Sequence, residues 1–416
     1  MLIKGGTPLN GTVRVQGAKN AALPVMASAI LLKGQALELD NVPDLQDVRT
    51  MAELLQRLGA EVSFTDGRMK ISVPEDLEWN TPADLVRKMR ASSLVLGPLT
   101  ARCGKTVLPL PGGCAIGSRP IDFHIKALRA MGARISLRNG AVYAETDGRL
   151  KGANVAFDFP SVGATENIMM AAALADGSTT IENAACEPEI VNLANVLRGM
   201  GVPIFGDGTP AMRIMGQNFL KSSRASVVPD RIEAATYLVG GVISGGKVKV
   251  EGIEPQMLAA ALQKLEEAGA KLTLEPDSIT AEYAGKLSAV SIKTMPHPGF
   301  PTDAQPQFMA LLSIADGTSV IQEGIFESRL RHVPEFNKTG TKIAVQENTA
   351  VIEGVPEIKG AEMFATDLRA GAAMILLGIA AEGVSKVGNL DHVWRGYEDI
   401  IGKLNSLGAK IKLIEE

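Results

Sequence analysis

Residues 54–60 read LLQRLGA, and this short pattern returns five more times, as LRAMGA at 128–133, LRGMGV at 197–202, LEEAGA at 265–270, FNKTGT at 336–341 and LNSLGA at 404–409. Each copy ends an amphipathic stretch with a glycine, as at a helix C-terminus where a left-handed residue closes the last turn. The central glycines are separated by 73, 69, 68, 71 and 68 residues; they are Gly59, Gly132, Gly201, Gly269, Gly340 and Gly408. A period of about 70 residues is too long for a simple solenoid unit and fits a small βαβ-type module.

Each module also contains an earlier and more apolar stretch that predicts a second helix. These stretches are apolar nearly all round, so the helices should be buried; they span residues 21–31, 91–100, 164–175, 232–243, 304–315 and 368–381. The segment after a central glycine alternates in polarity, as at Glu61–Phe64, and predicts a strand with one wet face. The modules therefore predict an α/β fold with three repeats in each of two domains.

The domain boundary is expected at residues 221–229, where serines and a proline lie between the third and fourth modules. A chain of 416 residues is too long for one compact core, so two domains are the default. The first 20 or so residues contain two strand-like stretches but no module of their own, and we expect them to complete the last module. This predicts an N-terminal domain at 20–228 and a C-terminal domain made of 1–19 and 229–416, with two chain crossings.

The net charge, the cysteines and the apolar runs argue against several classes of binding partner. A net charge of −4 argues against non-specific nucleic-acid binding. The three cysteines lack paired spacing, and no Cys/His group has the spacing of a metal site, so we expect no disulfide framework, no metal and no cofactor. The N-terminus lacks a signal-peptide core, and the longest uncharged apolar runs are about a dozen residues, short of the ~20 that span a bilayer. We expect a cytoplasmic protein with no membrane partner; the sequence leaves its oligomeric state open.

Polar and charged residues stand at the starts of the predicted buried helices. They are Lys19-Asn20, Arg90, Ser161 to Thr165, Asp230-Arg231, Thr302-Asp303, and Asp367 with Arg369. Helix N-termini carry unpaired N–H groups and a positive dipole end, so several of them together predict a site for phosphate and carboxylate groups. For the Asp, Ser and Thr residues, ordinary helix capping is the simpler explanation. The cations oppose the dipole and need a partner, either an anionic ligand or a carboxylate of the protein.

The most distinctive local feature is PLPGGCAIGSRP at 109–120, with three prolines and three glycines in twelve residues. This composition predicts a loop with defined hinges. Its Cys114 has only small neighbours to pack against, so a core role is disfavoured, and Arg119 close by would favour the thiolate. Cys103 and Cys186 are interpreted as inert core residues.

With these motifs in hand, the sequence resembles the enolpyruvyl transferases over essentially its whole length, and most closely those that act on UDP-N-acetylglucosamine. The resemblance lies in the combination GAKNAALP at 17–24, MRAS at 89–92, LPGGCAIG at 110–117, SVGAT at 161–165, PDRIE at 229–233, FPTD at 300–303, ATDLRA at 365–370 and RGYE at 395–398. It implies an inside-out α/β barrel with three βαβαββ-type repeats per domain. It also implies enolpyruvyl transfer from phosphoenolpyruvate to the 3′-hydroxyl of UDP-N-acetylglucosamine, the first committed step of peptidoglycan synthesis.

The resemblance also assigns roles to individual residues. Cys114 matches the loop cysteine that protonates phosphoenolpyruvate and that fosfomycin alkylates, and Asp303 matches the carboxylate at the sugar hydroxyl. Lys19, Arg119 and Arg395 match the cations around phosphoenolpyruvate, with Asp367 and Arg369 nearby. The remaining matches are contacts to the sugar nucleotide and its surroundings: Asn20, Arg90, Pro120, Ile121, Asp122, Phe123, Ser161, Val162 and Ile325.

Two other functions remain open at this stage. Transfer to shikimate 3-phosphate is the rival within the same fold, and the Cys114 loop argues against it. A non-catalytic UDP-sugar sensor, in which Cys114 reports oxidation or electrophiles, is the rival from another class. Phosphate release with one acceptor or the other separates these possibilities.

Overall fold

The computed structural model describes residues 1–110 and 121–414, which form two compact units. The N unit comprises the described residues from Gly17 to Val228, and the C unit comprises Met1–Gln16 together with the chain from Pro229 onward. Each unit has its own hydrophobic core. The boundaries predicted from the sequence stood at 19/20 and 228/229.

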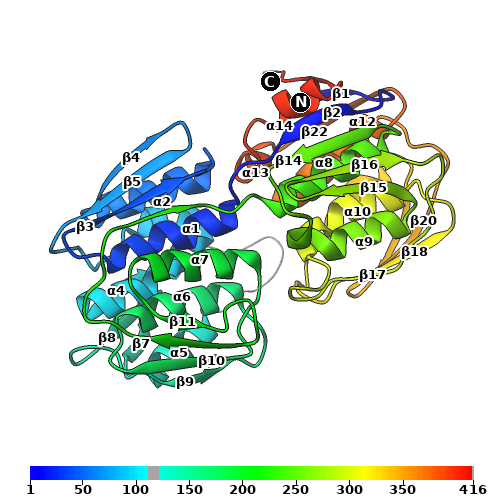
Figure 1. The fold of residues 1–416 in the computed structure, drawn as a ribbon. Coiled ribbons are helices and arrows are strands. Elements are labelled where there is room, and N and C mark those ends of the chain that lie inside the picture. The colour runs from blue at the N-terminus through cyan, green and yellow to red at the C-terminus, as the bar shows by residue number, and fades with distance from the viewer. Residues whose placement is uncertain (111–120, 415–416) are drawn as a thin grey trace. The chain divides into compact units, whose positions relative to one another are not determined.

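The N unit contains three modules, each built around one sheet (Figure 1). The first has β13 (Ser223–Ser226), α1 (Lys19–Ser28), η1 (Ala29–Leu31), β3 (Gln35–Asp40), α2 (Gln46–Arg57), β4 (Glu61–Thr65) and β5 (Arg68–Val73). The second has α3 (Ala83–Lys88), η2 (Arg90–Val95), α4 (Leu96–Cys103), β6 (Lys105–Pro109), α5 (Asp122–Ala130), β7 (Arg134–Arg138) and β8 (Ala141–Glu145). The third has β9 (Asn154–Ala156), α6 (Val162–Ala173), β10 (Ser178–Glu182), α7 (Pro188–Gly199), β11 (Ile204–Phe205) and β12 (Ala211–Met215).

The C unit repeats the plan three times. Its first module has β2 (Asn10–Arg14), α8 (Arg231–Ile243), β14 (Lys247–Glu251), η3 (Pro255–Leu258), α9 (Ala259–Glu267), β15 (Ala270–Glu275) and β16 (Ser278–Tyr283). Its second has β17 (Ile292–Lys293), η4 (Thr302–Ala304), α10 (Gln305–Leu312), β18 (Thr318–Gln322), α11 (Val333–Asn337), β19 (Lys342–Gln346) and β20 (Thr349–Glu353). Its third has β21 (Glu362–Phe364), α12 (Leu368–Ala380), β22 (Val384–Gly388), α13 (Asp391–Trp394), α14 (Ile400–Ser406), β23 (Lys410–Lys412) and β1 (Leu2–Lys4).

The five four-stranded sheets are mixed and share one strand order, and the three-stranded sheet β6-β8-β7 is antiparallel. In the third module of the N unit, β9 runs parallel to β10, and β12 pairs antiparallel with both β10 and β11. The second module has a single parallel bridge, Asn80 to Val107, in place of the first strand. In the last module, β1 lies between β22 and β23, so that the buried Ile3 stands opposite Ser385 and Ile411. β1 thus completes the last module as predicted. The other N-terminal strand, β2, instead pairs with β14 of the first module of the C unit, so the prediction that the whole N-terminal segment completes the last module was wrong for β2. The predicted α/β repeat architecture is confirmed.

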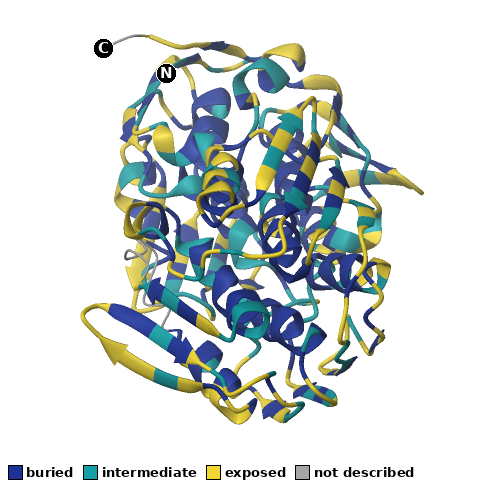
Figure 2. Ribbon diagram, turned by 90° about the vertical axis from the view of Figure 1, so that its left-hand side faces the viewer, coloured by how far each residue is buried: buried dark blue, intermediate teal, exposed yellow. Residues whose placement is uncertain are grey.

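The two helix types behave as the sequence predicts. All 13 residues of α8 are buried, and Figure 2 shows several helices that are dark blue along most of their length. The six central glycines have φ values of 109°, 93°, 104°, 100°, 89° and 105°, which side chains rarely adopt. They end the exposed helices and turn the chain into the next strand.

Residues 221–229 are more than the break between modules that the sequence suggested. They contain β13, which pairs in parallel with β3 from Ser223 opposite Leu37 to Ser226 opposite Asp40. The strand is short and polar, so no periodicity marks it. An exchange results: β2 precedes α1 in the chain but pairs with β14 of the C unit, whereas β13 precedes α8 but pairs with β3 of the N unit.

Candidate active site

Asp303 lies between two arginines in the C unit. Its Oδ1 is 3.1 Å from Nη2 of Arg329, and its Oδ2 is 3.1 Å from Nη2 and 3.2 Å from Nε of Arg369. The side chains of Arg329 and Arg369 are only 2% and 3% exposed, whereas that of Asp303 is 27% exposed. Burial lowers the pKa of Arg369, but the surrounding groups, Asp303 first among them, together outweigh burial, and the net pKa is raised. Arg369 is therefore a permanent cation, and the accessible carboxylate is held by the two guanidiniums.

Three helix starts come together around this group. Asp367 is the N-cap of α12 and accepts hydrogen bonds from the backbone of Arg369 at 2.9 Å and Ala370 at 3.2 Å. Asp230 caps α8 in the same way, and its charge also acts on Arg369. Asp303 itself lies in η4, which leads into α10. Capping thus accounts for Asp230 and Asp367, and the cation Arg369 finds its partner in Asp303.

A buried polar group stands behind Arg369. The hydroxyl of Tyr397 lies 2.9 Å from Oγ1 of Thr236, and Nε2 of Gln307 donates to both, at 3.0 Å to Thr236 and 3.2 Å to Tyr397. The only hydrogen of the Thr236 hydroxyl goes to the carbonyl of Ile232 at 2.8 Å, so Tyr397 must donate to Thr236. The ring of Tyr397 lies 5.5 Å from Cζ of Arg369. Nη1 of Arg369 is buried and has no hydrogen-bond partner among residues 1–110 and 121–414.

In the N unit, the start of α1 carries Lys19 and the exposed Asn20. Nζ of Lys19 is 3.2 Å from Oδ2 of Asp47 on α2, and the two side chains are 12% and 7% exposed. The cation at this helix start therefore has a protein carboxylate beside it. Arg90 opens η2 and is half-buried.

The start of α6 is built by Ser161, the N-cap, whose Oγ accepts from the backbone of Ala164 at 3.4 Å, followed by Val162. Ile121 precedes α5 and is buried, Asp122 is its exposed first residue, and the ring of Phe123 lies 5.8 Å from that of Phe157. His124 is buried, and a Cβ built on Gly163 would lie 3.7 Å from its ring. Burial, with the nearby charge of Arg90, lowers the pKa of His124 to about 4, so the ring is neutral near pH 7.

Three predicted site residues, Cys114, Arg119 and Pro120, lie outside the described residues. Arg395 follows α13 and is half-buried, two residues before Tyr397. Cys103 and Cys186 are half-buried rather than part of the core. Burial raises the pKa of both thiols, which disfavours the reactive thiolate.

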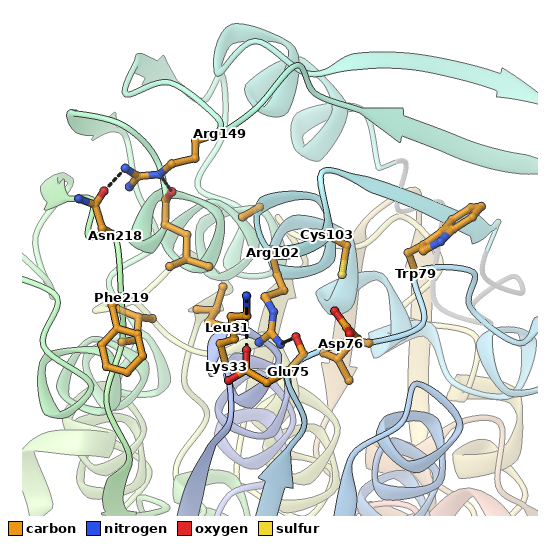
Figure 3. A pocket seen from close by; sticks show the side chains of 14 residues that line it. Leu31, Lys33, Glu75, Asp76, Trp79, Arg102, Cys103, Arg149, Asn218 and Phe219 are labelled. Carbon is orange, nitrogen blue, oxygen red and sulfur yellow. Dashed lines mark hydrogen bonds and ion pairs between the residues drawn. The ribbon is translucent and has the colours of Figure 1, made fainter.

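A hollow of about 410 Å³ in the N unit lies elsewhere (Figure 3). It is lined by the carboxyl ends of the buried helices, among them Leu31, Ala101 to Cys103 and Leu174, and by none of the predicted site residues. Arg102 closes one side by donating to the carbonyls of Ile30, Leu32, Pro74 and Glu75. The guanidinium thus caps carbonyls at the end of η1 and ties them to the loop after β5, which is a structural role.

Sequence reasoning missed several residues of the C-unit group. Arg329 was not singled out, although it lies four residues after Ile325 in the same loop. Thr236 and Gln307 are polar residues inside apolar helices, which was the available signal, and Tyr397 lay in a quoted motif without a role. Buried polar positions need partners, and these partners come from other modules.

The described part of the chain contains neither a helix that could span a membrane nor a group of side chains that could hold a metal ion. No helix there is both long enough and apolar enough to cross a membrane. Within residues 1–110 and 121–414, no three His, Cys, Asp or Glu side chains are grouped so as to hold a metal ion.

Comparisons with known proteins find relatives that match this chain over its whole length. The chain is 50% identical to UDP-N-acetylglucosamine 1-carboxyvinyltransferase 2 of Carboxydothermus hydrogenoformans, covering 100% of this chain and 99% of that protein. It is 49% identical to UDP-N-acetylglucosamine 1-carboxyvinyltransferase 1 of Halalkalibacterium halodurans, covering 100% and 94% of the two chains.

Solved structures extend the likeness to the fold. The enolpyruvyl transferase NikO from Streptomyces tendae matches with a TM-score of 0.89 at 26% identity, over 99% of this chain and 98% of that one. The EPSP synthase from Acinetobacter baumannii shares the fold with a TM-score of 0.76 at 18% identity, over 99% of each chain. The family model for EPSP synthase (3-phosphoshikimate 1-carboxyvinyltransferase) matches residues 3–404. The chain belongs to the enolpyruvyl transferase family.

Proposed function

We propose that the protein transfers the enolpyruvyl group of phosphoenolpyruvate to the 3′-hydroxyl of UDP-N-acetylglucosamine. The sugar oxygen adds to C2 of phosphoenolpyruvate while C3 takes a proton, which gives a tetrahedral intermediate. Loss of phosphate and of a proton from C3 then leaves the enolpyruvyl ether. The product starts peptidoglycan synthesis, and both substrates are metabolites of the cytoplasm, where we expect the enzyme to act.

The observation that carries the proposal is Asp303 with its two buried arginines. A carboxylate that is 27% exposed at helix starts can accept the proton of a sugar hydroxyl. When Asp303 takes that proton, Arg369 loses its directly bonded carboxylate, whereas Arg329 keeps Asp367 at 3.7 Å; an anionic co-substrate can replace the lost charge. Because Nη1 of Arg369 is buried and has no partner among the described residues, a phosphate or carboxylate oxygen suits this position.

The other roles follow from the family resemblance. Cys114 is the proposed acid at C3, and Lys19, Arg119 and Arg395 are proposed to hold phosphoenolpyruvate. Arg90, Ser161, Val162 and Ile325, with Asn20 and residues 120–123, are proposed contacts or neighbours of the sugar nucleotide. The domains at 20–228 and at 1–19 with 229–416 are proposed to close on the substrates, which would exclude water from the intermediate.

Phosphate release tests the proposal directly. The protein is mixed with phosphoenolpyruvate and either UDP-N-acetylglucosamine or shikimate 3-phosphate. Release with the sugar nucleotide supports the proposal, release only with shikimate 3-phosphate contradicts the acceptor, and no release with either favours a sensor. Cys114→Ala should abolish turnover near pH 7, whereas Cys114→Asp, another proton donor, should retain some activity and resist fosfomycin.

A further inference from the structure

Glu323 is a buried carboxylate at the end of β18 that the proposed mechanism does not use; it is 2% exposed. Its Oε1 accepts hydrogen bonds from the backbone N of Ile325 at 2.8 Å and of Phe326 at 3.2 Å, and from Oγ1 of Thr294 at 2.8 Å. Its Oε2 accepts from Oγ1 of Thr302 at 3.0 Å. Four neutral donors thus hold the carboxyl group of Glu323, and this arrangement fixes its geometry.

Two of these donors, the backbone N–H groups of Ile325 and Phe326, belong to the turn after β18. Gly324 donates its N–H to Oγ1 of Thr294 at 2.8 Å, and a Cβ at Gly324 would meet the carbonyl oxygen of Thr294 at 2.7 Å. The backbone of Glu323 is itself paired with Asn348, N to O at 2.8 Å. The turn therefore has one conformation, and it presents Ile325, the proposed nucleotide contact.

The other arm of Glu323 reaches the residue before Asp303. Thr302 is held from both sides, because its hydroxyl donates to Glu323 and its carbonyl accepts from Nη2 of Arg329 at 3.2 Å. The same Nη2 lies 3.1 Å from Oδ1 of Asp303. The backbone position of Asp303 thus depends on Glu323 through Thr302.

We propose that Glu323 is a positioning residue that fixes the proposed base, Asp303, and the turn carrying Ile325 in one common frame. This inference rests on the proposed function. Glu323 contacts no substrate in this scheme; it acts through Thr302 on the hydroxyl-activating carboxylate and through the 324–326 turn on the sugar nucleotide. Each arm therefore predicts a different kinetic defect.

Steady-state kinetics with both substrates separates the two arms. Thr302→Val removes only the hydrogen bond from Thr302 to Oε2 of Glu323, through which Glu323 acts on Asp303, so kcat should fall about 10- to 100-fold, as for loss of a hydrogen bond to a charged group, with little change in KM for UDP-N-acetylglucosamine. Glu323→Ala frees both arms and should also raise that KM. Glu323→Gln keeps a carbonyl oxygen for the turn, and the Thr302 hydroxyl can accept from the amide, so it should restore most of the activity.

Thr339→Val is the matched control. Thr339 lies in the same module and is fully buried, whereas Thr302 is half-buried. The Thr339 hydroxyl donates to the carbonyl of Phe336 at 2.8 Å, beyond α11, and not to Glu323. If Thr302→Val and Thr339→Val give the same kcat and KM while the unmodified protein turns over, Glu323 has no positioning role. If the unmodified protein releases no phosphate with UDP-N-acetylglucosamine, the proposed function fails first, and this inference fails with it.

Discussion

Lowering the pH from 7 to 5 should destabilise each unit through one buried histidine. His124 in the N unit and His332 in the C unit both have a pKa lowered by burial to about 4, against an ordinary value of 6.5. Between these values the unfolded chain binds a proton that the folded chain refuses, so stability is complete above about pH 6.5 and falls as the pH drops toward 4. At pH 5 the loss is about 2 kcal/mol per histidine, and it reaches about 3 kcal/mol below pH 4.

Buried carboxylates act in the opposite direction, so the pH profile of the unmodified protein alone is a poor test. Burial raises the pKa of Glu166 in the N unit and of Glu233 in the C unit, and each therefore adds stability as the pH falls. The difference between the protein and a variant removes this contribution, because both carry the same carboxylates. His124→Asn and His332→Asn are the informative variants. The quantity to compare is how steeply their free energy of unfolding changes with pH, not its value at pH 7.

Urea unfolding at pH 7.0, 6.0 and 5.0 provides the measurement, with each transition fitted separately because two units can unfold independently. His124→Asn should flatten the pH dependence of one transition by about 2 kcal/mol over this range, and His332→Asn should flatten that of the other. If either variant keeps the slope of the unmodified protein in both transitions, that histidine is not neutral in the folded state and the reasoning from burial is wrong.

Three further outcomes can be checked on single variants. Tyr397→Phe keeps the ring beside Arg369 but removes the buried hydroxyl, so kcat should fall about tenfold, and stability should fall by about 1–2 kcal/mol because Thr236 and Gln307 lose a hydrogen-bond partner; a kcat equal to that of the unmodified protein would exclude a role for the hydroxyl. Arg102→Ala leaves four carbonyls at the hollow without their donor and should cost about 3 kcal/mol in urea unfolding, whereas Arg102→Lys should recover only part, because an ammonium cannot reach all four. Gly132→Ala should lose about 1–2 kcal/mol through its φ of 93° alone, since no atom lies within 4 Å of the added Cβ; a neutral effect in calorimetry would contradict the left-handed constraint.

The repeat plan could be predicted from the sequence because it depends on local rules. A glycine at the end of each amphipathic helix and an apolar helix before it are visible within a few residues, and all six glycines have the predicted positive φ. β13 could not be predicted in the same way. Its four residues, Ser223–Ser226, are half exposed and polar, and only pairing with β3, more than 180 residues earlier, makes them a strand.

The same distinction between local rules and long-range contacts applies to the residues of the candidate site. Asp303, Asp367 and Arg369 were found from helix starts and motifs, and the structure brings them together. Arg329 was missed because its role depends on a contact between a loop and a helix start of the same module, 26 residues apart. For Lys19 the sequence left two partners open, and Asp47 proves to be one. Such long-range partners are brought together by the packing of the fold, and a local sequence pattern cannot predict them.

The placement of β1 has a consequence for synthesis on the ribosome. β1 emerges long before its partners β22 and β23, and Met1 donates to the carbonyl of Val387, 386 residues later. The N unit can complete the sheet that contains β3 once β13 has emerged, whereas β1 stays unpaired until β22 and β23 have emerged. A nascent chain stalled after β13 has left the exit tunnel, and before β22 has, should therefore hold a folded N unit and a protease-sensitive segment at Met1–Gln16.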